Sequence, residues 1–394
     1  MLLRHAKIVN EEFQLKELDL RICGEKIAEI GSGLLANPGE EELDLRGCYI
    51  LPGFIDTHIH GAYGMRISDP DVDLAQMTRF EATQGVTGMA ITTASSNGVR
   101  LVKQMGIALE LAKGWNGESE NTEFPGVKGT GTKILGIHAE GPFLCKEYKG
   151  AMSAGNLIAP DQTLVDTMIE ESQGLLKIMT VAPEEEGVLD LIPYLIQKGI
   201  TVSMGHTNAT YEDTKKAMKA GVLRTTHTFN AMRPLNHREP GILGAAMTEP
   251  DICCEMICDY VHLHPATVKL LYMVKGADRL MMVSDSGHAA GMNISEFEVD
   301  GIKRYVKDGV VRLANGTIAG SVKTLLDGVQ NLAKDGVPLT DIAKMASYNP
   351  ARTLGLERVT GSIGEGKLAD LAILDQDLNV QYTFINGSCV YRKN

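Results

Sequence analysis

The chain has 394 residues, of which 44% are hydrophobic and 22% charged, a composition typical of globular proteins and not of disordered or collagen-like ones. Its length allows two or three domains, or one large barrel with an appendage. The formal net charge is −12 and no run of Lys or Arg occurs. This argues against a nucleic-acid or anionic-membrane surface, since neutralising phosphates requires a basic face.

The cysteines and the N-terminal residues bear on the compartment. Seven cysteines form an odd number with no C-x-x-C pair, which favours reduced thiols, and so the cytoplasm, over a disulfide framework. Cys253, Cys254 and Cys258 gather in an apolar run, and we expect them in the core and not on a metal. The first residues lack the apolar core of a signal peptide, and no stretch is long enough to predict a membrane span.

Both ends of the chain have the pattern of short β-strands. Near the N-terminus, Gly24-Glu25-Lys26 predicts a hairpin turn between two strands. Residues 369–375, 380–387 and 389–393 repeat this pattern at the C-terminal end. Since each end alone is too small to bury a core, we expect residues 1–52 and 350–394 to form one small β domain of the sandwich type.

The middle of the chain, residues 53–349, has a different sequence pattern. Helix-compatible segments separate most of eight apolar, β-rich runs, which are residues 49–60, 85–95, 133–142, 175–184, 199–207, 224–232, 253–262 and 280–286. Strands that alternate with helices indicate parallel pairing and right-handed crossovers. Eight units predict an α/β fold of the (β/α)8 TIM-like barrel type. A doubly wound open sheet is the competing fold, and it is disfavoured because no G-x-G-x-x-G follows the first strand.

Polar residues stand where the predicted strands end, which is where the loops of such a barrel converge. His58 and His60 end the first strand, and because residues two apart share a strand face, both can aim at one ion. The other candidates follow later strands: Glu140, His206, His227, His262 and Asp285. Imidazole nitrogen and carboxylate oxygen suit a divalent metal such as Zn, Fe, Mn or Co, and Glu140 could bridge two ions.

A metal held in this way implies hydrolysis. It lowers the pKa of water towards about 7 and polarises an amide or ester carbonyl. Asp285 is placed to accept the proton of this water and to pass it to the leaving nitrogen. His138 shares a strand face with Glu140, and we interpret it as a support for the ligands or a substrate contact. His5 and His288 are expected to be surface or loop residues.

Several motifs resemble those of a known family. Residues Pro52 to Gly61 are similar to the opening signature of the amidohydrolase superfamily, and the run from Gly361 to Leu371 is similar to its closing one. Within the superfamily, the chain resembles the N-acetylglucosamine-6-phosphate deacetylases across about residues 50–375. The motifs that carry this resemblance are His138–Phe143, Gly205–Ala209, Thr226–Met232, Arg238–Gly241, Ser284-Asp285, Gly316–Ser321 and Asn349–Arg352.

The resemblance implies a role for each candidate. Glu140, His206 and His227 would bind the principal metal, and His58 with His60 would complete a second site, so that each subunit holds one or two ions. Asp285 would be the general base and then the general acid. The substrate, a phosphorylated N-acetyl amino sugar, would be released as acetate and glucosamine 6-phosphate. Its contacts would be His262 at the sugar or acetyl carbonyl, Arg238 at the phosphate across a homodimer, and Asn230, Ala231, Ala151 and Ile318 around the sugar.

The sequence leaves alternative functions open. Met152 and residues 286–288 depart from the usual pattern near the sugar pocket, so a deacetylase for N-acetylgalactosamine 6-phosphate stays possible. Cyclic-amide hydrolases usually bridge their metals with a carboxylated Lys that ends strand 4. Here that strand ends at residues 180–184 and its Lys177 lies earlier, which argues against them. An inactive barrel used for binding or assembly is disfavoured because all the ligand candidates and the acid are present.

Overall fold

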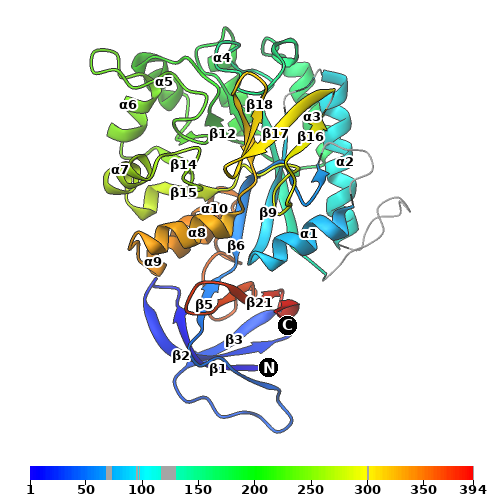
Figure 1. Cartoon of the computed structure of the whole chain (residues 1–394), viewed down its shortest axis with the longest axis vertical. Coiled ribbons are helices and arrows are strands. Elements are labelled where there is room, and N and C mark those ends of the chain that lie inside the picture. Colours follow the sequence, from blue (N-terminus) through cyan, green and yellow to red (C-terminus); the bar gives the residue numbers. More distant parts are fainter. Residues whose placement is uncertain (68–72, 95, 97, 117–129, 300, 394) are drawn as a thin grey trace.

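The computed structural model describes residues 1–67, 73–94, 96, 98–116, 130–299 and 301–393. Eight parallel strands form a barrel sheet that occupies the upper part of the molecule in Figure 1, and a second sheet lies below it. The barrel strands, in chain order, are β6 (Phe54–Ile59), β9 (Val86–Thr93), β10 (Lys133–Glu140), β11 (Leu176–Val181), β12 (Thr201–Met204), β13 (Arg224–Thr225), β14 (Cys253–Ile257) and β15 (Leu280–Val283). The expected (β/α)8 TIM-like barrel is confirmed.

The barrel closes between its first and last strands. The backbone N–H of Asp285, just after β15, donates to the carbonyl of His58 on β6 at 2.9 Å, and the N–H of His60 donates to Ser286 at 2.9 Å. Residues of β6 and β9 are buried along their whole lengths, as expected where both faces of a parallel strand are covered. Closure therefore joins two segments that carry candidate site residues.

One helix follows each barrel strand, and the eight helices surround the sheet (Figure 1). Asp161 caps α3 and Thr210 caps α5 by accepting backbone N–H groups of the first turn, which explains why these helices begin there. The eight helices are α1 (Leu74–Thr83), α2 (Gly98–Asn116), α3 (Gln162–Ser172), α4 (Val188–Gln197), α5 (Tyr211–Lys219), α6 (Gly241–Thr248), α7 (Pro265–Lys275) and α8 (Leu325–Lys334).

Strands from both chain ends hydrogen-bond in the second sheet, whose order is β22-β21-β20-β5-β1-β2-β3, with β4 paired to β1. The predicted hairpin turn is present, with Gly24 at φ 57° between β2 and β3. The domain boundaries at residues 52 and 350 stay a prediction. The strands are β1 (Leu2–Val9), β2 (Leu15–Cys23), β3 (Lys26–Gly31), β4 (Glu42–Asp44), β5 (Tyr49–Pro52), β20 (Leu371–Leu374), β21 (Val380–Ile385) and β22 (Ser388–Arg392).

Buried contacts tie the second sheet to the barrel. The Lys133 ammonium at the start of β10 contacts the Asp370 carboxylate just before β20 at 2.5 Å, and both side chains are buried. The Thr383 hydroxyl on β21 donates to the carbonyl of Ala82 on α1 at 2.7 Å. At the barrel floor, Ala351 of α10 (Asn349–Thr353) packs with barrel residues such as Ile55. Before it lie α9 (Leu339–Ala343) and a π-helical turn at Lys344–Tyr348.

Three features differ from the sequence patterns. The run 49–60 is two strands, β5 in the second sheet and β6 in the barrel, because the chain passes from one to the other at Gly53. The run 224–232 contributes only the two residues of β13. Between β15 and α8 lies an antiparallel sheet that the sequence did not indicate, formed by β16 (Glu296–Val299), β17 (Ile302–Lys307), β18 (Val310–Leu313) and β19 (Ile318–Ser321).

Smaller features complete the described chain. A two-stranded ribbon, β7 (Gly61–Ala62) and β8 (Met65–Arg66), follows the first barrel strand. Cys254 on β14 and Cys258 just after it are buried, as expected for core cysteines, whereas Cys253 is only partly buried. Within the described residues, no helix is both long and apolar enough to cross a bilayer.

Candidate metal centre and active site

The five candidate ligands and the candidate acid Asp285 lie together at the carboxyl end of the barrel, although up to 227 positions separate them in the sequence (285 − 58). His58 is the buried penultimate residue of β6, Glu140 is the buried last residue of β10, and His60 follows β6 directly. His206, His227 and Asp285 come one or more residues after their strands and have positive φ angles of 47°, 30° and 47°. These left-handed conformations turn the chain out of the strand at the point where each side chain is needed.

The first cluster is formed by Glu140, His206 and His227. Glu140 Oε1 lies 3.1 Å from His206 Nε2 and 3.0 Å from His227 Nε2, and the two imidazole nitrogens are 3.1 Å apart. All three side chains are buried. The residues therefore present three ligand atoms to one point, in the grouping that the resemblance implied for the principal metal.

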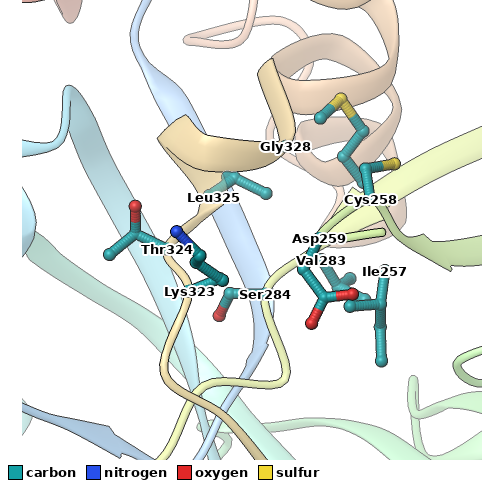
Figure 2. A pocket seen from close by; sticks show the side chains of 10 residues that line it. Ile257, Cys258, Asp259, Val283, Ser284, Lys323, Thr324, Leu325 and Gly328 are labelled. Carbon is teal, nitrogen blue, oxygen red and sulfur yellow. The ribbon is translucent and has the colours of Figure 1, made fainter. Parts of the chain in front are cut away.

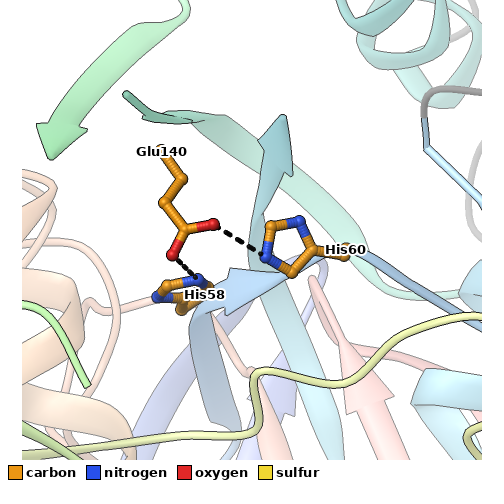
Figure 3. A group of neighbouring side chains, drawn as sticks. All are labelled: His58, His60 and Glu140. Carbon is orange, nitrogen blue, oxygen red and sulfur yellow. Dashed lines mark ion pairs between the residues drawn. The ribbon is translucent and has the colours of Figure 1, made fainter. Parts of the chain in front are cut away.

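The second cluster shares Glu140 with the first. Figure 3 shows that one oxygen of its carboxylate faces the imidazole of His58 and the other faces that of His60. His58 Nε2 lies 3.5 Å from Oε1 and His60 Nε2 lies 3.3 Å from Oε2. Asp285 Oδ1 lies 3.6 Å and 3.4 Å from the same two nitrogens. Glu140 is thus the side chain common to both clusters.

The donor set fits a divalent metal ion. His58 Nε2 is buried and has no hydrogen-bond partner among the described residues. The facing nitrogens of His206 and His227 cannot both be acceptors at 3.1 Å without a shared positive charge between them. Buried carboxylates need the same compensation. Imidazole and carboxylate ligands are those that zinc and related transition metals take in proteins.

Hydrogen bonds on the other ring nitrogen fix how the histidines present their ligand atoms. Nδ1 of His206 lies 2.7 Å from the carbonyl of Tyr148, and Nδ1 of His60 lies 3.2 Å from the carbonyl of Thr92. A carbonyl only accepts, so each Nδ1 carries a proton, which leaves Nε2 as the nitrogen that faces the cluster and could bind a metal ion. Nδ1 of His58 faces a carboxylate, Glu255, in the same way.

Charges within the cluster shift its titration. Burial opposes protonation of His60, but hydrogen bonds to Asp285 and Glu140 raise its pKa to about 9. Burial also opposes ionisation of Asp285, but the charge of His58 and the hydrogen bond with His60 lower its pKa to about 2. Asp285 is therefore an ionised carboxylate near neutral pH, as a proton acceptor must be.

His138 lies just below the clusters. Its Nδ1 is 3.0 Å from the carbonyl of Thr57 and its Nε2 is 2.7 Å from the hydroxyl of Thr180. Burial and the nearby charge of His58 lower its pKa to about 3, so the ring is neutral. With both nitrogens engaged, His138 supports the residues around it and does not reach a ligand position.

A cavity of about 650 Å³ opens above the clusters. Its size is in the range of small-molecule sites. Ten of the predicted site residues line it: His60, Glu140, Ala151, His206, His227, Asn230, Ala231, His262, Asp285 and Ile318. His58 lies buried beneath it. Arg238 is exposed in the loop before α6 and does not line the cavity of its own chain, so the structure does not bring it together with the others.

His262 is held by an acidic neighbour. Its Nδ1 lies 2.7 Å from Asp259 Oδ2, which also accepts from the Ser321 hydroxyl at 3.0 Å. Although burial opposes it, the hydrogen bond to Asp259 raises the pKa of His262. Asp259 and Lys323 line a small adjoining pocket between the ends of β14 and β15 and the start of α8 (Figure 2), which has no room for a sugar. His262 therefore offers Nε2 to the large cavity.

The structure adds residues that the sequence did not single out. His288, expected at the surface or in a loop, does lie in a loop but lines the cavity, because its ring stacks on Phe297 of β16 with centroids 4.8 Å apart. Arg66, Arg100 and Arg304 line the same cavity. Glu255, whose one sequence signal is an acidic residue within the apolar strand run 253–258, contacts His58.

A protein-family model, known sequences and a solved structure all match this chain over most of its length. The model of the amidohydrolase family matches residues 49–390. An N-acetylglucosamine-6-phosphate deacetylase of Bacillus subtilis (strain 168) is 33% identical over 394 residues, covering 99% of this chain and 97% of the relative. An N-acetylgalactosamine-6-phosphate deacetylase of Escherichia coli O157:H7 is also 33% identical, over 98% of both chains. The crystal structure of N-acetylglucosamine-6-phosphate deacetylase from Thermotoga maritima aligns over 100% of both chains, with 34% identity and a TM-score of 0.88.

Proposed function

This chain belongs to the amidohydrolase family, and from that premise we propose that it is a metal-dependent deacetylase. The reaction is the hydrolysis of N-acetylglucosamine 6-phosphate to glucosamine 6-phosphate and acetate. Relatives named for this activity are 30–35% identical over most of the chain. The observation that carries the proposal is the convergence of four histidines, Glu140 and Asp285 at the floor of one cavity.

We propose Glu140, His206 and His227 as the ligands of a principal metal ion, and His58 and His60 as ligands of a second. The ion is one of Zn, Fe, Mn or Co, which accept these ligands alike. When bound, a divalent metal supplies Lewis acidity, which polarises a carbonyl and makes water a better nucleophile near neutral pH. Glu140 neutralises part of the added charge within the buried site.

Asp285 performs the proton transfers in this proposal. Its ionised carboxylate accepts a proton as the water oxygen bonds to the acetyl carbon. It then donates that proton to the sugar nitrogen as the carbon–nitrogen bond breaks, so that acetate and a free amine leave. Its position beside His60, at 3.4 Å, keeps the carboxylate at the mouth of the barrel between the two steps.

The cavity residues would hold the sugar. His262, kept in place by Asp259, offers a ring nitrogen to the sugar or to the acetyl carbonyl. Asn230 and Ala231 follow β13, and Ala151 and Ile318 face the same cavity from the loop after β10 and from β19. We assign these residues to the walls of the sugar site, because small and amide side chains leave room for a hydrated ring.

We propose that the chain forms a homodimer in which Arg238 contacts the phosphate of the substrate bound in the cavity of the partner subunit. A guanidinium suits phosphate through its paired donors. The side chain is exposed and does not line its own chain's cavity, so its role requires a second copy. We also propose the cytoplasm as the compartment, since all seven cysteines are free thiols.

A second candidate substrate is N-acetylgalactosamine 6-phosphate. The relative named for that sugar is as similar to this chain as the Bacillus subtilis relative, at 33% identity in both cases. The two sugars differ in the orientation of one hydroxyl. A panel of N-acetylated sugars, with and without the 6-phosphate and assayed for free amine, identifies the preferred one. A chain that releases amine from none of them, whichever metal is supplied, would contradict the proposal.

Asp285→Asn tests the assigned chemistry. The amide cannot accept the proton, so we expect kcat to fall by at least about 100-fold, the scale of one acid–base group. Metal content by elemental analysis and the circular dichroism spectrum should stay as in the wild type. Asp377→Asn, an exposed Asp in the turn between β20 and β21, is the matched control and should keep full activity. Near-normal turnover of Asp285→Asn would reject the role.

A further inference from the structure

A buried carboxylate joins the two halves of the candidate metal centre from below. Glu255 lies on β14 and is fully buried. Its Oε2 accepts two hydrogen bonds, one from His58 Nδ1 at 3.2 Å and one from the backbone N–H of His227 at 2.9 Å. One oxygen thus contacts a candidate ligand of each metal position, on β6 and just after β13.

The other oxygen of Glu255 is held by an arginine. Arg224 Nη2 donates to Oε1 at 2.5 Å and to the hydroxyl of Thr57, the neighbour of His58, at 3.1 Å. Arg224 is buried, and its Nε and Nη1 have no hydrogen-bond partner in the described part of the chain. Buried ion pairs with unsatisfied donors contribute little to stability compared with apolar residues of the same size. Its place inside the barrel therefore calls for a reason other than packing.

We propose that Glu255 is a positioning residue for the second metal site, with Arg224 as its counterion: it orients His58 and so determines how tightly the His58–His60 position holds its ion. This inference rests on the metal centre of the proposed function. It goes beyond that function by assigning the retention of the second ion to a residue that is not a ligand.

The two histidines depend on Glu255 to different degrees. His58 has its ring fixed through Glu255, because Nδ1 must donate to the carboxylate and Nε2 is then the lone-pair nitrogen. His227 uses only its backbone N–H, and its ring reaches Glu140 and His206 independently. A change at Glu255 should therefore weaken the second position while the first is kept.

Arg224 has the opposite effect on metal binding at the His58–His60 position. Its positive charge cancels the negative charge of Glu255, so the pair adds no net charge beneath the metal site. Removing Arg224 leaves the carboxylate on His58 and takes away a cation that repels a metal ion. The nearby group of His58, His138 and Glu255 does not compete as a third metal site, because both ring nitrogens of His138 are already engaged.

The test compares Glu255→Gln with Arg224→Met, since both break the same buried ion pair. Each protein is loaded with Zn²⁺ or Co²⁺ and desalted through a chelating buffer. Metal per subunit is then measured by elemental analysis, and the ligand field by the visible spectrum of Co²⁺. We expect two ions in the wild type and in Arg224→Met. Glu255→Gln should retain one ion and bind the second about 10- to 100-fold more weakly, the usual cost of losing such a partner.

A control and a second variant keep the test decisive. Asp370→Asn breaks the buried pair with Lys133, outside the metal site, and should lower stability without changing the metal content. If Glu255→Gln does not fold, Glu255→Asp keeps the charge but falls short of His58, and the same loss of the second ion is expected.

Three results would overturn the inference: two tightly held ions in both Glu255 variants, equal loss of the second ion in Arg224→Met, or a wild-type chain that never binds a second ion. The last would leave a single-metal deacetylase intact. Conversely, two ions in a chain that deacetylates no sugar would refute the proposed function and not this inference.

Discussion

At the scale of single residues, the site depends on backbone conformations that side chains rarely adopt. His206, His227 and Asp285 all have positive φ angles. Such conformations cost on the order of 1–3 kcal/mol each and persist where the surroundings enforce them. Gly150 also has a positive φ, of 57°, and a Cβ at this position would lie 3.2 Å from the ring of His206. The local strain lies where three strands end at the candidate metal centre.

The sequence predicted the candidate ligand residues that the structure brings together, but not the side chains that support them. The H-x-H pattern of His58 and His60 and the strand-end positions of the others follow from strand geometry. Glu255 reaches His58 across 197 positions, and only the closed barrel brings them together. The same holds for Asp259, whose contact with His262 depends on how the loop after β14 turns.

A buried acid on α1 gives a prediction about pH. Burial, with the charge of Asp56 added, raises the pKa of Glu81 to about 8 from its ordinary value of 4.5. Between these values the folded chain holds a proton that the unfolded chain releases, so this group makes stability fall as pH rises. Glu81→Gln, which stays neutral, should leave Tm unchanged near pH 5 and raise it by a few degrees at pH 8.

Thermal unfolding monitored by circular dichroism at both pH values checks the Glu81 prediction. Glu171→Gln, an exposed position on α3, is the control and should shift Tm equally little at each pH. An equal Tm change for Glu81→Gln at pH 5 and pH 8 would show that the wild-type carboxyl does not retain its proton.

At the scale of elements, the number of strands was easier to predict than their lengths. Eight apolar runs correspond to eight barrel strands, but β13 spans only Arg224–Thr225. The chain leaves the strand there because His227, Phe229 and Ala231 all have positive φ, which no residue type in that run signals. The four-strand insertion β16–β19 was missed because its strands are short and partly exposed, so they carry little apolar pattern.

Helix α5 tests whether local sequence signals stabilise the barrel. Thr210 and Asp213 form a capping box, in which the Thr210 hydroxyl accepts from the Asp213 N–H at 3.1 Å and the Asp213 carboxylate accepts from the Thr210 N–H at 3.3 Å. Thr210→Ala should lower the free energy of unfolding by about 1 kcal/mol. Urea denaturation measures the loss, and the deacetylation rate of the folded protein should not change.

The matched control for the cap is Thr167→Ala, a half-buried Thr inside α3 whose hydroxyl donates to the carbonyl of Thr163 at 2.9 Å. Alanine favours helix interiors, so this change should be neutral or slightly stabilising. If both substitutions shift the urea midpoint alike, the capping box does not stabilise α5.

At the scale of the whole molecule, the proposed site is incomplete in one chain. Arg238→Ala should raise KM for the 6-phosphorylated sugar by about 10- to 100-fold, the cost of one or two charge-assisted hydrogen bonds, and should leave KM for the unphosphorylated sugar nearly unchanged. Steady-state assays on both sugars measure this. An equal effect on both would remove Arg238 from phosphate binding.

Mixing two variants tests whether the arginine acts across subunits. In a mixed dimer of Asp285→Asn and Arg238→Ala, one cavity combines an intact Asp285 with an Arg238 from the partner subunit. We therefore expect activity at low substrate to recover after the two proteins are unfolded and refolded together. If mixing restores nothing while each parent refolds, Arg238 does not act across a dimer.

The pairing of β5 with β20 in the second sheet constrains how the chain is made. During synthesis β5 leaves the ribosome long before β20, so it keeps an unpaired edge until residues 371–374 emerge. An exposed edge of this kind invites wrong pairing with other nascent chains. Translation products that stop before residues 371–374 keep this unpaired edge. Chaperones and proteases should therefore bind them more than the full-length chain.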